Sequence, residues 1–151
     1  MNNIQPYSKE FLKPCLSLFN SNVPSFFAIG EETLFQKYLA RQNINYYILF
    51  DRHNRLVGCG GYEHEIESKQ MTLTWGMIDK RFHNNGYGRC LTDYRIQKIT
   101  TEYPQLNIVL NTSQYTFEFY QKFGFQITKI TKDYYSVGLD RYDMIKYQNL
   151  S

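Results

Sequence analysis

Long basic runs, long apolar runs and paired cysteines are all missing from this sequence of 151 residues. No run of five or more Lys and Arg occurs, and the formal net charge is only +3, which excludes the basic stripe of a dedicated nucleic-acid-binding module. No apolar stretch reaches the roughly 18 residues of a membrane span. The N-terminal residues 1–6 have neither the basic start nor the apolar core of a signal peptide. We therefore expect no nucleic-acid partner, no membrane association and a cytoplasmic location.

The cysteines are few and scattered. Cys15, Cys59 and Cys90 are odd in number and form no Cys-x-x-Cys pair. This spacing argues against a disulfide framework and against a zinc site. We predict three buried thiols in a reducing compartment and no bound metal.

What the sequence does contain is enough apolar material for a core. Hydrophobic residues make up 42% of the chain and aromatic residues 17%, unlike the polar composition of a disordered segment. The length suits one domain, so we expect residues 1–151 to form a single unit. The surplus of aromatic residues leaves room for a homodimer face.

The spacing of apolar residues changes between the helical period and the strand period along the chain. In chain order it predicts a strand at 4–7, a helix behind a Ser8 cap ending near Ser21, a helix at 31–41, strands at 46–50, 56–65 and 70–78, a helix at 86–102, a strand at 107–111, a helix at 116–123 ending before Gly124, and strands at 125–132 and 142–147. This order predicts an α/β (α+β) domain in which helices flank one central, mixed and mostly antiparallel sheet.

The strongest local pattern is His83-Asn84-Asn85-Gly86-Tyr87-Gly88-Arg89, which we call the glycine turn. It stands where a strand ends and a long helix begins. Such a turn directs consecutive amide groups to one point, and the helix dipole adds positive potential there. A pyrophosphate fits this arrangement, although an isolated Gly-x-Gly is more often a turn without a ligand.

A second pattern follows about thirty residues later and changes this balance. The glycine turn resembles the coenzyme A motif of GNAT acetyltransferases, commonly written Q/R-x-x-G-x-G/A, and the segment Phe119-Tyr120-Gln121-Lys122-Phe123-Gly124-Phe125 resembles the family's F/L-Y-x-K-x-G-F segment. The resemblance extends from roughly Leu56 to Met144. His83 replaces the usual Gln or Arg, which leaves open whether this side chain contacts the pyrophosphate.

The resemblance implies an N-acetyltransferase that uses acetyl-coenzyme A as co-substrate. It implies that a primary amine attacks the thioester directly. It also implies that the sheet splays between the strand ending near Ile78 and the strand at 107–111, around the cofactor. The cofactor-binding residues implied are Met77, Ile78 and Asp79 through their main chain, together with His83, Asn84, Asn85, Gly86, Tyr87, Gly88, Arg89, Ser113 and Tyr120.

Two side chains are candidates for moving protons. Tyr120 matches the family tyrosine that donates a proton to the departing sulfur, and a phenol can do so while staying mostly protonated at neutral pH. Taken without the family motif, Tyr120 would be a core aromatic residue. Glu63 is the first candidate base because it lies nearest to the Gly60-Gly61 break, which we interpret as a strand bulge.

Several alternatives remain open at this stage. His64, Glu65 and Asp140 are further base candidates, and each of them is commonly a solvated surface group. Ser113 or Thr112 is also a plausible cap of the helix that carries Tyr120. Residues 134–142 either wall an acceptor pocket or form an ordinary long connection between strands.

The acceptor is open too, and it is either a small molecule or a protein amine. The alternative function is a sensor that binds coenzyme A or acetyl-coenzyme A without turnover.

Overall fold

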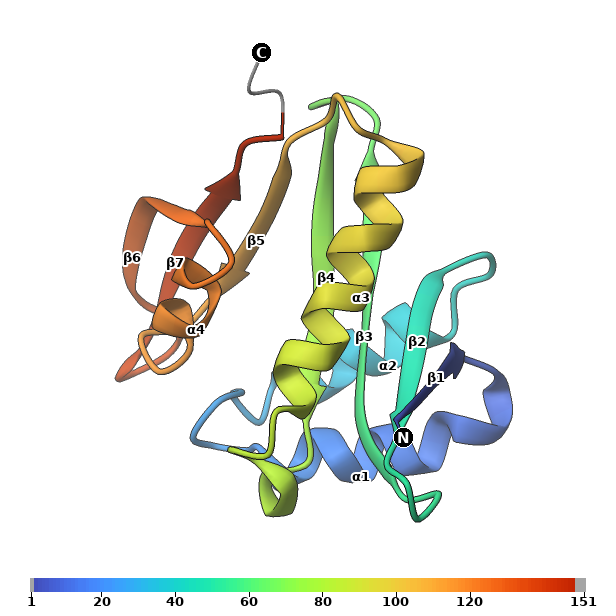
Figure 1. The fold of residues 1–151 in the computed structure, drawn as a ribbon. Helices are drawn as coiled ribbons and strands as arrows, with labels where there is room; N and C mark the ends of the chain where they lie inside the picture. Colours follow the sequence, from blue (N-terminus) through green and yellow to red (C-terminus); the bar gives the residue numbers. More distant parts are fainter. Residues whose placement is uncertain (1, 149–151) are drawn as a thin grey trace.

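Seven strands form one sheet in the order β1-β2-β3-β4-β5-β7-β6 in the computed structural model, which describes residues 2–148 (Figure 1). The strands are β1 (Asn3–Pro6), β2 (Asn45–Phe50), β3 (Leu56–Glu65), β4 (Gln70–Ile78), β5 (Ile108–Thr112), β6 (Gln126–Ser136) and β7 (Leu139–Lys146). All neighbours pair antiparallel except β4 and β5, which run parallel. The predicted fold class and the predicted order of elements are confirmed.

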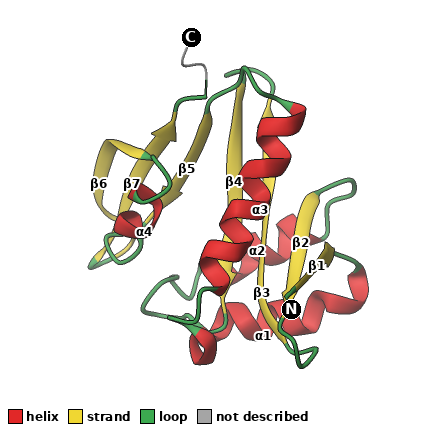
Figure 2. Ribbon diagram, viewed as in Figure 1, coloured by secondary structure: helices red, strands yellow, loops and turns green. Residues whose placement is uncertain are grey.

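Helices cover both faces of this sheet (Figures 1 and 2). They are α1 (Leu12–Ser21), α2 (Glu31–Leu39), α3 (Tyr87–Glu102) and α4 (Phe117–Gln121), with short 3-10 turns η1 (Lys9–Phe11) and η2 (Lys80–Phe82). Neighbouring strand residues point to opposite faces. Accordingly, Tyr46 packs in the core beneath α1 and α2, whereas Tyr47 packs in the core beneath α3. Within residues 2–148, no helix is long and apolar enough to cross a membrane.

The sheet opens between its two parallel strands. β4 and β5 pair only at Met71 with Ile108 and at Thr72 with Val109. Beyond these pairs the two strands diverge, while β5 continues along β7 (Figure 2). The predicted splay of the sheet between residue 78 and residues 107–111 is therefore confirmed.

A bulge bends the middle of β4. The pairing of β3 with β4 shifts between Cys59 and Gly61, and Trp75 adopts a φ of 43°, which is uncommon for a bulky residue. The hydroxyl of Tyr46 donates a 2.7 Å hydrogen bond to the carbonyl oxygen of Trp75 and holds this peptide in place. The predicted irregularity at Gly60-Gly61 is present in the pairing, but the extra residue lies in β4, where Trp75 and Gly76 face Gly60.

The last hairpin corrects one expectation. The alternative that residues 134–142 form a long connection between strands is wrong, because β6 runs to Ser136 and β7 begins at Leu139. The polar residues that suggested a loop bond across the tight turn instead. The Asp133 carboxylate accepts from the Gly138 amide at 2.7 Å, and the Asp140 carboxylate accepts from the Asp133 amide at 2.8 Å.

Two smaller expectations also fail. Ser8 does not cap a helix, since its hydroxyl donates to the Glu10 carboxylate at 3.1 Å and caps no amide. Of the three cysteines, Cys15 and Cys59 are buried as predicted, but Cys90 is only half-buried because its position on α3 lies at the edge of the core. All three thiols are free.

Candidate functional site

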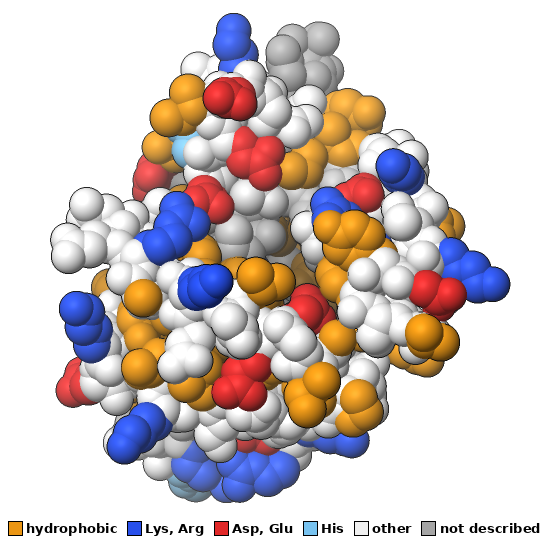
Figure 3. Space-filling view, turned by 180° about the vertical axis from the view of Figure 1, so that it is seen from behind, with side chains coloured by type: hydrophobic (Ala, Val, Ile, Leu, Met, Phe, Trp, Pro, Cys, Tyr) orange, Lys and Arg blue, Asp and Glu red, His pale blue; other side chains and the backbone are white. Residues whose placement is uncertain are grey.

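A cleft of about 1010 Å³ occupies the opening between β4 and β5. One wall comes from α3 and α4, with Leu91, Phe119 and Tyr120. The other comes from the loop between α1 and α2, with Phe26 and Phe27. Viewed from the face opposite α3, the molecule is hollowed at its centre, and hydrophobic, acidic and basic side chains border the hollow (Figure 3). The cleft therefore reaches both faces of the sheet.

The glycine turn forms one end of this cleft. Asn84 and Gly86 both adopt left-handed conformations, with φ of 63° and 81°. Gly86 is the N-cap of α3 and offers no side-chain acceptor, so the amides of Tyr87, Gly88 and Arg89 have no partner within the helix. Free amides and the positive end of a 16-residue helix suit a pyrophosphate group.

Small residues keep this end of the cleft open. A Cβ atom at Gly86 would meet nothing within 4 Å. A Cβ atom at Gly88 would lie 3.4 Å from the Phe119 ring and 3.7 Å from the Ile78 side chain, which is ordinary van der Waals contact. Position 88 thus faces the gap between α4 and β4, where any side chain would narrow the cleft.

Most residues of the glycine turn line the cleft, namely His83, Asn84, Gly86, Tyr87, Gly88 and Arg89. Asn85 does not. Its side-chain amide donates to the carbonyl oxygens of Phe82 and His83, at 3.1 and 2.9 Å, and so stabilises the turn itself. Arg89 is 81% exposed and only loosely paired with Asp93, at 3.9 Å. Its charge therefore remains available to an anion at the start of α3.

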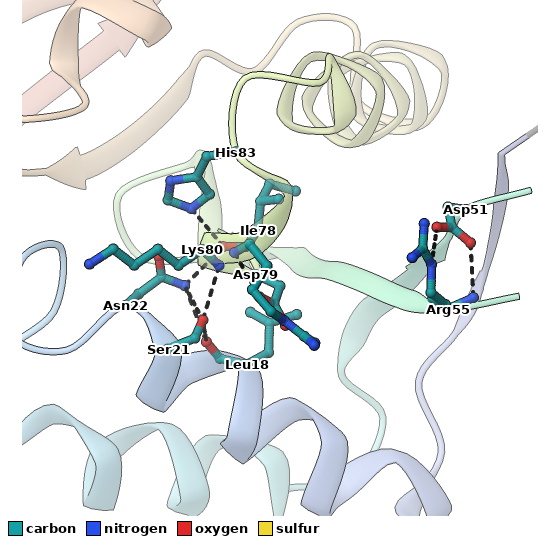
Figure 4. A network of polar contacts seen from close by, with 10 residues as sticks. Leu18, Ser21, Asn22, Asp51, Arg55, Ile78, Asp79, Lys80 and His83 are labelled. Carbon is teal, nitrogen blue, oxygen red and sulfur yellow. Dashed lines mark hydrogen bonds and ion pairs between the residues drawn. The ribbon is translucent and has the colours of Figure 1, made fainter. Parts of the chain in front are cut away.

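The end of β4 is tied to the end of α1 (Figure 4). The carbonyl oxygen of Ile78 accepts from Asn22 Nδ2 at 2.9 Å and pairs with His83 Nε2 at 2.9 Å. Because a carbonyl oxygen only accepts, Nε2 of His83 must carry a proton. Both lone pairs of this oxygen are occupied, so a ligand cannot use it. Met77 and Ile78 still line the cleft.

Asp79 lies just outside the cleft lining. Its carboxylate accepts from the Arg81 amide at 2.9 Å and from the Arg81 guanidinium at 2.9 and 3.1 Å. The hydrogen bonds from Arg81 hold the pKa of Asp79 below its usual range, although burial opposes them. The Asp79 amide donates to the carbonyl oxygen of Val57 at 2.8 Å. Its side chain and its amide therefore stabilise the connection between β4 and α3.

Tyr120 stands on the wall formed by α4. Its ring contacts the edges of Phe119 and Phe125, so the predicted packing stripe exists on this five-residue helix. Tyr120 lines the cleft, and within residues 2–148 its hydroxyl makes no hydrogen bond to another protein atom. This hydroxyl is therefore free to bond a ligand.

Ser113 lines the cleft near Tyr120 and is 4% exposed. The prediction that Ser113 or Thr112 caps α4 is wrong, since the N-cap is Thr116 and no side chain caps there. The Ser113 carbonyl oxygen accepts from the amides of Thr116 and Phe117 instead. Its hydroxyl accepts from the Tyr115 amide at 3.2 Å.

The base candidates separate in space. Glu63 and Glu65 line the cleft, and Glu63 forms a 2.5 Å ion pair with Arg41 at the rim. His64 packs against the Tyr103 ring, and Asp140 lies in β7 beside the hairpin turn, where it accepts from the Asp133 amide. Neither of these two lines the cleft. Glu63 and Glu65 are therefore the acids that the structure brings into the same cleft as Tyr120.

Sequence reasoning missed Phe26, which lines the cleft and packs edge-on against His83 and Tyr115. This residue stands on a loop and belongs to no motif. The segment 134–142 was one predicted wall of a pocket, and Tyr134, Tyr135 and Arg141 do line the cleft. The Tyr135 hydroxyl donates to Asn111 Oδ1 at 2.5 Å. Among residues 2–148, no group of three His, Cys, Asp or Glu side chains is placed to hold a metal ion.

Arg95 was missed as well, although a signal existed. It stands four residues after Leu91 and four before Ile99, on the buried stripe of α3, and it is 2% exposed. A charged residue at an apolar position of a helix is rarely buried without a reason. Arg95 lines the cleft.

Comparison with known proteins agrees with this geometry. A family model described as the acetyltransferase (GNAT) domain matches residues 20–148. No curated protein matches the chain by sequence.

Solved structures share the fold at low identity. The ribosomal-protein-S18-alanine N-acetyltransferase from Escherichia coli superposes with a TM-score of 0.81 at 15% identity, covering 100% of this chain and 96% of that one. Ard1 from Thermoplasma volcanium gives 0.78 at 18% identity, with 97% of each chain covered. An aminoglycoside 6'-N-acetyltransferase complexed with coenzyme A gives 0.76 at 14% identity, with 99% and 98% covered.

Proposed function

The chain belongs to the GNAT acetyltransferase family, and from that membership we propose that it moves an acetyl group from acetyl-coenzyme A to a primary amine. The whole chain acts as one domain. The amine attacks the thioester directly, so no acetyl group rests on the protein. The acceptor is a small molecule or a protein amine. The shared fold does not fix that choice, because specificity resides in the variable loops.

One observation carries this proposal. The cleft between β4 and β5 joins the free amides at the start of α3 to the free hydroxyl of Tyr120. The amides and Arg89 would hold the pyrophosphate of the cofactor, and Gly88 leaves its arm room to pass between Ile78 and Phe119. A bound arm of that shape would place its thioester between β4 and Tyr120.

Tyr120 is proposed to donate a proton as the leaving group departs. A C–N bond forms between the amine and the acetyl carbon, the C–S bond breaks, and its electron pair stays on sulfur. The Tyr120 hydroxyl then protonates or hydrogen-bonds this sulfur. The position of Tyr120 on the cleft lining, with no hydrogen bond from its hydroxyl to another atom of residues 2–148, supports this role.

Glu63 is proposed to accept the proton that the amine loses, directly or through one water. It lines the cleft on the side opposite Tyr120's helix, where an acceptor would enter. Its ion pair with Arg41, at 2.5 Å, holds the carboxylate at the rim of the cleft. Carboxylates on this side would also attract a protonated amine from solution.

Thiol release on addition of amines tests the proposal. The purified chain is mixed with acetyl-coenzyme A and a panel containing peptides, polyamines and amino sugars, and free thiol is followed with a colorimetric reagent. At least one amine should give release that depends on enzyme concentration. Binding of acetyl-coenzyme A without release for any amine would favour a sensor instead, and absence of binding would refute the proposal.

A further inference from the structure

Arg95 is a buried cation over the bulge of β4. Its guanidinium lies against Gly60 of β3 and Gly76 of β4. A Cβ atom at Gly76 would come within 2.7 Å of Nη2, and one at Gly60 within 3.2 Å of Nη1. A side chain at either position would occupy the space of the guanidinium, so Arg95 fits only while both residues are glycine. The arrangement places the charge on the α3 face of β4, on the cleft wall.

This cation lacks an anionic partner. Nη1 donates to the carbonyl oxygen of Gly61 at 3.2 Å, and Nη2 donates weakly to Thr92 Oγ1 at 3.5 Å. Nε is the one buried side-chain nitrogen or oxygen in residues 2–148 that has no partner. Burying a charge without a counter-ion is costly. An unpaired buried arginine on a cleft wall points to a negative charge that arrives with a ligand or develops during a reaction.

The position of Arg95 selects which negative charge this is. The pyrophosphate end of the cleft lies at Gly86–Arg89, two turns earlier on α3. Arg95 instead borders the bulge at Gly76, and it lines the same cleft as Tyr120. Under the proposed function, the thioester lies between β4 and Tyr120.

We propose that Arg95 supplies the positive charge that stabilises the thiolate of coenzyme A when the C–S bond breaks. This inference rests on the proposed function. The electron pair of the broken bond stays on sulfur, next to a guanidinium that keeps its proton in proteins. Tyr120 then delivers its proton to a sulfur whose charge is already balanced. Arg95 thus acts through its fixed charge, and Tyr120 through proton donation.

The first experiment needs no variant and no acceptor. The thiolate of coenzyme A is titrated by ultraviolet absorbance, bound to the protein and free in the same buffer. The complex with desulfo-coenzyme A is subtracted to remove protein tyrosines. The other titratable or charged groups on this side of the cleft are Glu63 and Glu65 from β3, Tyr120 from α4, and Tyr134, Tyr135 and Arg141 from the β6–β7 hairpin. Tyr38 from α2 lies outside the lining, and its hydroxyl bonds Thr74. The bound thiol should titrate about one pH unit or more below the free thiol, because a nearby fixed cation favours the thiolate. An unshifted or raised value would overturn the inference.

Variants then identify the source of the shift. Arg95→Met removes the charge and keeps much of the volume, and Arg95→Lys keeps a charge. The methionine variant should lose the shift, the lysine variant should retain part of it, and Tyr120→Phe should retain most of it. Affinity for acetyl-coenzyme A, which has no thiolate, should change less than about threefold in all three, whereas affinity for coenzyme A above the titration point should fall about tenfold in the methionine variant.

The outcomes separate this inference from the proposed function. If Arg95→Met does not give a folded circular dichroism spectrum, Arg95→Gln replaces it, because glutamine keeps a donor for Gly61. If the titration of the bound thiol remains shifted in Arg95→Met or Arg95→Gln, Arg95 only fills the space over the glycines. Wild-type protein that binds neither coenzyme A nor acetyl-coenzyme A would refute the proposed function and this inference together. Binding with an unshifted thiol would refute this inference alone.

Discussion

The two ends of the cleft are built in different ways. The end at α3 consists mainly of main-chain amides from one continuous turn, residues 84–89. The far end consists of side chains from separate segments, including Glu31, Glu63 and Tyr135. A main-chain site depends on backbone shape and therefore on glycine, whereas a side-chain site can change with each residue. The first should serve the invariant cofactor, and the second should set the acceptor.

The two ends of the cleft also differ in charge. Arg89 and the helix dipole make the α3 end positive, while Glu31, Glu63 and Glu65 line the other part of the cleft. Burial raises the pKa of Glu31, although the hydrogen bond from the Ala28 amide opposes this. The polarity matches an anionic cofactor at one end and a cationic amine at the other.

The largest expected effect lies where the two ends meet. Tyr120→Phe keeps the ring and its contacts with Phe119 and Phe125 but removes the proton donor. We expect the rate constant of acetyl transfer in a single turnover to fall roughly 100-fold, while the affinity for acetyl-coenzyme A stays unchanged. Thermal stability should hold, because the hydroxyl has no buried partner to lose. Transfer as fast as in the parent enzyme would make Tyr120 a packing residue.

The next effect should be confined to the cofactor end. Gly88→Asp places a carboxylate beside the free amides of α3, and we expect affinity for coenzyme A, measured by calorimetry, to fall at least tenfold, about 1.4 kcal/mol. Gly88→Ala is the matched control, since its methyl group makes only ordinary contact with Phe119. It should lose much less. Equal affinity for wild-type protein and the aspartate variant would rule out an amide site for the pyrophosphate.

A third change should act only at the far end. Glu63→Gln removes a carboxylate whose partner Arg41 is 54% exposed, so the pair contributes under about 1 kcal/mol to stability. We expect kcat/KM for the acceptor to drop about tenfold at neutral pH while affinity for coenzyme A stays constant. Glu65→Gln, also on the cleft, is the control and should retain more activity. The reverse ranking would move the base to Glu65.

The smallest effect concerns the segment between the two ends. Asp79→Asn should lower the free energy of unfolding by about 1 kcal/mol at pH 7, because Arg81 loses a charged acceptor. The folded-state pKa of Asp79 is lowered, so its stabilisation is present above the unfolded value of about 4 and is lost as pH falls through the folded value. Urea unfolding should therefore show wild type and variant converging below that pH. Weaker coenzyme A binding without any loss of stability would instead place Asp79 in the site.

The same contrast explains how much the sequence could predict. The order of elements was predictable because the hydrophobic period and the turn residues have local structural causes. The splayed sheet and the GNAT family were expected from the resemblance of two motifs to that family. The hairpin turn was not predictable, since Asp133 and Asp140 bond across it only once the strands are paired. The local pattern marked Arg95 as a charge on a buried helix stripe, but its contacts with Gly60 and Gly76 come from other strands and leave no local pattern.

A crystal structure of the chain with coenzyme A tests the central claim most directly. We expect the pyrophosphate to lie within hydrogen-bonding distance of the amides of residues 86–89, and the cofactor arm to pass between β4 and β5 towards Tyr120. The same map would show whether Ile78 keeps its carbonyl bonds to Asn22 and His83, as expected. Coenzyme A bound elsewhere on the molecule, with the opening between β4 and β5 empty, would contradict the account.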